Sequence, residues 1–140
     1  MSRYPFFYTI RKHTDMPMGY PVETTNDKII LSSIKFKNFT FTTSRPNNVA
    51  IMNNGDIIII NSIYVRTINN ISVGSVIIEG EQLVFHRDIF DYPMPSRKVG
   101  IMYVRKNKNS LKRYYVKDIS MKCIYTKLNK KKVIITLLHL

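Results

Sequence analysis

The stretch Asn53-Asn54-Gly55-Asp56-Ile57-Ile58-Ile59-Ile60 decides the fold class of this chain. Asn-Gly favours positive φ at both central positions of a tight turn, and it is the strongest β-hairpin signal in the sequence. Four consecutive isoleucines follow at once, and a short continuous apolar run is typical of a strand covered on both faces. We therefore expect a hairpin here, with a buried second strand.

Short runs of apolar and β-branched residues recur on both sides of this hairpin, with turn residues between them. The runs are residues 28–36, 39–43, 49–52, 57–60, 63–68, 71–78, 82–86, 99–105, 111–116, 119–126 and 133–138. No segment keeps a convincing helical period of apolar residues. The sequence therefore predicts an all-β fold, a single small barrel of about ten short strands.

Glycine, asparagine and proline mark the irregular points between these runs. We expect a bulge at Gly74, a turn at Gly80, a helical turn from His86 to Asp91, a loop at residues 92–96, and polar hairpin tips at residues 107–110 and 129–132.

The first 26 residues differ in character from the rest of the chain. They hold Pro5, Pro17 and Pro21 together with an aromatic cluster at residues 4–8. We expect residues 1–26 to form an irregular arm that packs against the barrel, with one strand at residues 6–10, and residues 27–140 to form the barrel domain. A chain of 140 residues has room for one such core.

Positive charge is concentrated near the C-terminus. The chain carries 22 Lys and Arg against 9 Asp and Glu. Residues 97–140 hold thirteen of these cations and one acid, Asp118, a net charge of +12. This asymmetry favours contact with a polyanion. A solvated lysine-rich surface in a chain with AT-rich codon usage is the alternative.

Several classes of protein are not expected from the composition. The single cysteine, Cys123, cannot form an internal disulfide or a multi-cysteine zinc site, and its alternating strand context indicates a buried thiol. Apolar runs such as residues 57–60 are no longer than four residues and too short to cross a bilayer, and no apolar signal segment opens the chain. We expect an intracellular protein without a membrane partner.

Motifs for catalysis are missing from the sequence. His13, His86 and His139 have no local metal-ligand spacing, and there is no nucleophile elbow or glycine-rich phosphate loop. Glu79 and Glu81 flank the expected turn at Gly80. The sequence therefore predicts no catalytic residue, no metal and no cofactor.

Because side chains alternate between the two faces of a strand, the sequence predicts which residues of the basic segment share a face. Arg113, Tyr115 and Lys117 share one face of their strand, which we expect to be the solvent face. Tyr103 and Arg105 are expected on another outward face, and Lys122 on the outward side of the strand whose inner residues include Cys123. The predicted nucleic-acid-binding residues are Arg105, Lys106, Lys108, Lys112, Arg113, Tyr115, Lys117, Lys130, Lys131 and Lys132.

The order of short motifs adds a resemblance. It runs through residues 28–36, 41–48 and 54–58, Asp91-Tyr92-Pro93, residues 99–101, 111–113 and 116–119, and the closing residues 133–139. Together these resemble the C-terminal β-domain of insect proteins related to CACTA-type transposases, which is similar to bromo-adjacent-homology domains. The resemblance covers about residues 28–140. It implies a small BAH- or SH3-like barrel of transposon origin, a nuclear location and a chromatin, DNA or protein contact, and it carries over no catalytic residue.

Three functions remain open at this point. The first is a non-catalytic module that binds nucleic acid or nucleosomal chromatin through the basic face. The second is a protein–protein adaptor or homodimerisation module that uses sheet edges and the N-terminal arm. The third is a small metal-free nuclease that uses two of the histidines.

Overall fold

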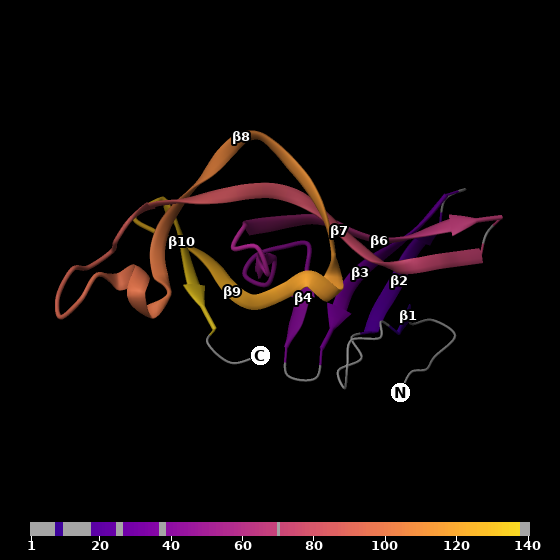
Figure 1. Ribbon diagram of the computed structural model, residues 1–140, viewed down its shortest axis with the longest axis horizontal. Helices are drawn as coiled ribbons and strands as arrows, with labels where there is room; N and C mark the ends of the chain where they lie inside the picture. The colour runs from indigo at the N-terminus through magenta and orange to yellow at the C-terminus, as the bar shows by residue number, and fades with distance from the viewer. Residues whose placement is uncertain (1–7, 10–17, 25–26, 37–38, 70, 138–140) are drawn as a thin grey trace.

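The protein is an all-β structure, seen here in a computed structural model that describes residues 8–9, 18–24, 27–36, 39–69 and 71–137 (Figure 1). The described residues form ten strands and two short 3₁₀ segments, and none of them is α-helical. The strands are β1 (Tyr8–Thr9), β2 (Met18–Thr24), β3 (Lys28–Lys35), β4 (Thr40–Thr42), β5 (Val49–Met52), β6 (Ile57–Ile68), β7 (Ile71–Arg87), β8 (Ile101–Tyr115), β9 (Ile119–Leu128) and β10 (Lys131–Thr136). The 3₁₀ segments are η1 (Ser96–Val99) and η2 (Val116–Asp118). The predicted fold class is confirmed.

Six strands close into a ring, and every pairing in it is antiparallel. The order is β6-β5-β9-β10-β8-β7, and β7 pairs back to β6 along most of its length. β3 joins this ring through β6, and β4 and β2 lie on either side of β3. In Figure 1, β2, β3 and the far ends of β6 and β7 form an extension beside the barrel, while β8 arches over it.

Two apolar cores lie on opposite faces of the sheet. The barrel core takes residues from all six ring strands: Val49, Ile59, Leu83, Val104, Cys123, Tyr125 and Ile134. The second core forms where β3 and β4 cover the other face, and it includes Phe41, Ile58 and Ile60. Because Ile59 faces one core and its neighbours face the other, β6 is buried on both sides, as the isoleucine run predicts.

Two hairpin turns differ from their predicted forms. The β5–β6 hairpin is confirmed, but only Gly55 has positive φ (91°), so the turn uses all of residues 53–56 rather than two residues with positive φ. The β9–β10 turn is the two-residue type instead, because Asn129 and Lys130 both have positive φ and Leu128 pairs with Lys131. Lys131 and Lys132 therefore belong to β10 and not to the tip.

Of the two predictions for glycines of β7, the one for Gly74 is confirmed and the one for Gly80 is wrong. Gly74 has φ of 81° and lies where the β6–β7 register shifts, so the expected bulge is confirmed. Gly80 is not in a turn. It lies inside β7, opposite Ile60, where a Cβ atom would stand 1.7 Å from the carbonyl oxygen of Ile59. Glycine is needed there because the backbones of two strands come into close contact.

The expected hairpin tip at residues 107–110 is wrong. These residues lie within β8, which pairs with β7 before and after them, and they form a large bulge opposite Gln82. The Ser110 hydroxyl accepts a hydrogen bond from the Gln82 backbone N–H (3.0 Å), and Asn107 donates to the Gln82 side chain (3.1 Å). The polar residues therefore satisfy a bulge rather than a turn, and they produce the arch of β8 in Figure 1.

The region after β7 also differs from the expected helical turn at His86 to Asp91. His86 lies within β7, and the short 3₁₀ helix η1 begins only at Ser96. Asp88 accepts hydrogen bonds from the Arg97 backbone N–H (2.9 Å) and guanidinium (2.7 Å), so it stabilises η1 from outside. Residues 92–95 are irregular, as the prolines predict.

The N-terminal arm contributes two strands to the sheet. β1 pairs with β2, and β2 pairs with β3 with register shifts on either side of Pro21. Of the strand predicted at residues 6–10, only Tyr8 and Thr9 lie within the described residues, and most of the aromatic cluster lies outside them.

Candidate nucleic-acid interface

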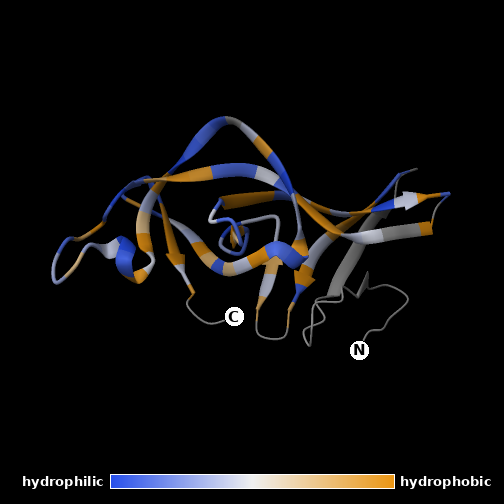
Figure 2. Ribbon diagram, in the orientation of Figure 1, coloured by the Kyte–Doolittle hydropathy of each residue, from blue (hydrophilic) through white to orange (hydrophobic). Residues whose placement is uncertain are grey.

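The basic segment forms three adjacent strands of the barrel, β9, β10 and β8. The predicted binding residues fall into two groups along β8, and Figure 2 shows hydrophilic residues on both flanks of the arch. One group lies on the first half of β8, the bulge and the β9–β10 hairpin: Arg105, Lys106, Lys108, Lys130, Lys131 and Lys132. The other lies on the second half of β8 and η2: Lys112, Arg113, Tyr115 and Lys117. The sequence did not indicate this division.

Acidic side chains from earlier in the chain lie against part of this segment. Lys106 pairs with Glu81 (3.4 Å), Lys112 with Asp56 (3.1 Å) and Arg113 with Glu79 (2.6 Å). The pairing of β7 with β8 places both glutamates there. The other predicted cations make no ion pair with a described residue: Arg105, Lys108, Lys117, Lys130, Lys131 and Lys132.

Asp56 connects the β5–β6 hairpin to β8. The Tyr114 hydroxyl donates a short hydrogen bond to its carboxylate, and Lys112 (3.1 Å), Asn54 (3.4 Å) and Gln82 (3.3 Å) donate as well. The hydrogen bond from Tyr114 is the largest cause that lowers the pKa of Asp56, and Lys112 and Asn54 lower it further, against the opposing effect of burial. Lys112 therefore has a structural partner in the hairpin.

Tyr103 lies on the face of β8 opposite the barrel-core residue Val104, as expected, but it is buried rather than exposed. It is 8% exposed, and two cations lie near its ring, Arg87 at 4.9 Å and Lys131 at 5.8 Å from the ring centroid. Arg87 comes from β7, outside the basic segment, and sequence reasoning missed it. Arg87 lies opposite Tyr103 in the pairing of β7 with β8. This pairing register brings the two residues together, and the sequence alone does not reveal it.

Lys122 is on the outward side of β9, as predicted from its place beside the core residue Cys123, but it is buried rather than exposed. It is 5% exposed, and its ammonium donates to the Thr40 carbonyl and to the Asn47 side chain (2.8 Å), 5.6 Å from the Phe41 ring centroid. Its face of β9 is covered by the loop before β5, and burial lowers the pKa of Lys122. This lysine therefore stabilises a loop and is not part of the basic surface.

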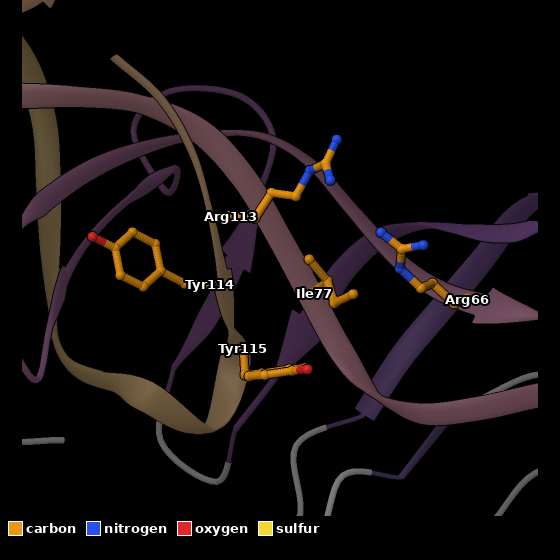
Figure 3. A pocket seen from close by; sticks show the side chains of 5 residues that line it. All are labelled: Arg66, Ile77, Arg113, Tyr114 and Tyr115. Carbon is orange, nitrogen blue, oxygen red and sulfur yellow. The ribbon is translucent and has the colours of Figure 1, made fainter.

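The predicted solvent face at the end of β8 and in η2 is confirmed. Arg113, Tyr115 and Lys117 are exposed, whereas Val116 is fully buried. The Lys117 ammonium lies 5.4 Å from the Tyr115 ring centroid. An open groove of about 410 Å³ lies beside these residues, lined by Arg66, Ile77, Arg113, Tyr114 and Tyr115 (Figure 3). We call it the β6–β8 groove. Arg66 comes from β6, and no pattern in the sequence places it beside Arg113.

The groups considered for chemistry lie apart in the described structure. Cys123 is buried as expected, and burial raises the pKa of its thiol to about 11. His86 is exposed at the end of β7, whereas His13 and His139 lie outside the described residues. Among the described side chains, no three His, Cys, Asp or Glu residues gather as metal ligands would. No helix among the residues that the structure describes is long and apolar enough to span a membrane.

Comparison with known families places the chain. A family described as "Domain of unknown function (DUF8592)" has a model that matches residues 12–137. The chain belongs to this family. The match includes all the strands from β2 to β10, so the barrel, the basic strands and the β6–β8 groove all lie within the DUF8592 domain. No curated protein and no solved structure matches the chain. The resemblance to transposase-related and BAH-like domains stays a prediction.

Proposed function

We propose that this DUF8592 protein is a non-catalytic module that binds nucleic acid through the exposed cations of β8, η2 and the β9–β10 hairpin. The observation that carries this proposal is the set of six predicted cations that make no ion pair with a described acid: Arg105, Lys108, Lys117, Lys130, Lys131 and Lys132. An unpaired surface cation can displace a counterion from a phosphate without first losing an acidic partner.

The arrangement favours contacts that position the protein on a phosphate backbone rather than contacts that read sequence. The cations are on strands and turns, and no helix among the described residues is available to enter a major groove. Their spread on both sides of the bulge suits an extended polyanion better than a single small anion. The proposal includes nucleosomal chromatin as a partner and a nuclear location, in keeping with the resemblance to the transposase-related β-domain.

A binding titration tests this proposal. We would measure fluorescence anisotropy with duplex DNA, single-stranded RNA and mononucleosomes at two salt concentrations. The test variant is Arg105→Ala/Lys108→Ala, because both side chains are exposed and neither makes an ion pair with a described residue. Loss of two phosphate contacts on duplex DNA reduces the slope of log K against log salt by about 1.8.

The matched control is Lys35→Ala/Arg45→Ala, which removes the same charge from exposed positions outside the basic segment. The control is expected to keep the wild-type slope. Equal effects of the two double variants would mean that net charge alone drives binding, and would refute a defined interface. No binding at low salt would remove the proposal altogether.

One observation favours a second candidate, a protein–protein adaptor. Ile68 and Ile71 are 63% and 67% exposed beside the β6–β7 turn. Exposed apolar side chains on a hairpin are suited to contact with an apolar surface of a protein partner. Ile68→Ser/Ile71→Ser is expected to leave nucleic-acid binding intact, and a loss of self-association by this variant in sedimentation would support the adaptor.

A further inference from the structure

The β6–β8 groove brings two guanidinium groups and an exposed aromatic ring to one face of the sheet. Tyr64, Ile77 and Tyr115 are direct partners across β6, β7 and β8, so they share this face, and Arg113 is paired with Glu79 on it. Figure 3 shows Arg113, Ile77 and Arg66 in a row across the three strands, with the Tyr115 ring below them and the Tyr114 ring pointing to the other side of β8.

Glu79 orients Arg113 without blocking it. The Arg113 Nε donates to the Glu79 carboxylate at 2.6 Å, and the Arg113 side chain is still 58% exposed. A guanidinium has five N–H donors, so the groups on its two terminal nitrogens remain free to bind an anion. Arg66 is exposed and makes no ion pair with a described residue. The groove therefore offers two donor groups for phosphate.

The Tyr64 hydroxyl is a further polar group on this face. Tyr64 is 1% exposed, and its hydroxyl oxygen has no hydrogen-bond partner among the described residues. The Lys28 ammonium lies 4.4 Å from the Tyr64 ring centroid, so a third cation is near the same side chain. A buried hydroxyl without a partner is uncommon. Tyr64 is not among the residues that line the groove, so its hydroxyl is not a contact for a bound ligand.

Tyr115 and Ile77 supply the apolar part of the groove. Tyr115 is 48% exposed, which leaves ring surface open to solvent, and Ile77 lies directly opposite it in the ladder. The volume of about 410 Å³ lies within the range of roughly 300–1,000 Å³ found for small-ligand sites. Phosphate donors beside an aromatic face match a nucleotide with an accessible base.

We propose that the β6–β8 groove binds one nucleotide of a single-stranded nucleic acid. Arg66 and Arg113 hold its phosphate, and its base stacks on Tyr115. This inference rests on the proposed nucleic-acid function and narrows it to unpaired strands. In a duplex the bases are stacked on each other and cannot lie on an external ring, so a duplex can use only the cations of the interface.

The test compares four oligonucleotide probes by fluorescence anisotropy at one salt concentration. These are a single-stranded RNA, a single-stranded DNA, the same DNA with abasic sites, and a DNA duplex. The abasic strand keeps every phosphate but has no base to stack. The variants are Tyr115→Leu and Arg66→Gln, with Tyr115→Phe and Arg66→Lys as matched controls that keep the ring and the charge. Circular dichroism checks that each variant is folded.

The proposal predicts that Tyr115→Leu weakens single-stranded binding by about tenfold and leaves duplex binding within about twofold. Tyr115→Phe keeps wild-type affinity, and the abasic strand binds wild-type protein as weakly as the intact strand binds Tyr115→Leu. Arg66→Gln weakens single-stranded binding, and Arg66→Lys retains most of it.

Three results would overturn the proposal in distinguishable ways. Equal binding of intact and abasic strands, together with an unchanged Tyr115→Leu variant, would refute the groove while the Arg105→Ala/Lys108→Ala result could still uphold the basic interface. Competition by a phosphoserine peptide as strong as by the intact strand would assign the groove to phosphate alone. Absence of binding by wild-type protein to all four probes would refute both the groove and the proposed function.

Discussion

Gly80→Ala is expected to be among the most damaging single substitutions in the barrel. Gly80 lies in the middle of β7, opposite Ile60, where the β6–β7 register shifts. An added Cβ would stand 1.7 Å from the Ile59 carbonyl oxygen and 2.8 Å from its carbonyl carbon. These atoms are backbone atoms of a strand paired on both sides, so they cannot move without disturbing the closure of the barrel.

The expected loss follows from this geometry. Overpacking a core costs about 1–3 kcal/mol, and the upper end applies because the contact is with backbone rather than with a flexible side chain. For a chain of 140 residues, an unfolding entropy of about 2.1 cal/mol/K per residue converts 3 kcal/mol to a fall of about 10 °C in Tm. Gly80 also separates Glu79 and Glu81, which pair with Arg113 and Lys106, so the substitution should shift the basic surface too.

Thermal and urea unfolding measure this loss, with Gly74→Ala as the control. Gly74 has positive φ, but a Cβ there would meet no atom within 4 Å. Its substitution is expected to cost about 1–2 kcal/mol from backbone strain alone. If Gly80→Ala were no more destabilising than Gly74→Ala, the close approach of β6 and β7 at this point would be wrong.

Three further predictions concern buried or hydrogen-bonded groups. Because burial raises the pKa of Cys123 from 9.0 to about 11, the thiol ionises at a lower pH in the unfolded chain than in the folded protein. The stability that the neutral thiol contributes below pH 9 is therefore lost as the pH rises towards 11. This loss amounts to about 2–3 kcal/mol, and urea unfolding of Cys123→Ala should show a shallower decline. Lys122→Met leaves two oxygen acceptors unpaired and is expected to cost about 1–3 kcal/mol in urea unfolding, whereas Lys127→Met, on the exposed end of β9, stays within about 0.5 kcal/mol. Since hydrogen bonds lower the pKa of Asp56, the ionised carboxylate stabilises the fold above pH 3.8, and this stabilisation is lost as the pH falls through the lowered pKa of Asp56. Asp56→Asn should therefore make the loss of folded structure at acid pH less steep in a circular-dichroism titration.

Local signals predicted the strands and some of the turns. The isoleucine run of β6 could be placed between two cores because a strand with one solvent face would alternate. The turn after β5 could be predicted because Asn-Gly acts within four residues. Residues 107–110 have the same polar composition as a turn, and only the continued pairing of β7 and β8 on either side distinguishes a bulge from a hairpin tip.

The candidate site was less accessible to sequence reasoning because it depends on pairs far apart in the chain. Alternation correctly assigned Arg113 and Tyr115 to the exposed face. It could not reveal that Glu79 lies against Arg113, or that Arg66 lies across the same groove, because both depend on strand register. Lys122 has an outward strand position, and its burial comes from a loop that crosses the outside of β9.

The central claim is that a phosphate backbone is held by the six barrel cations that make no ion pair with a described residue. The most direct measurement is the affinity of the wild-type protein for single-stranded RNA over a series of salt concentrations. Contact of each of these six cations with one phosphate predicts a slope of about −4.2 in a plot of log K against log salt. A slope near zero, or no measurable binding at the lowest salt, would contradict the claim and leave the cations of β8 and β10 as a solvated surface.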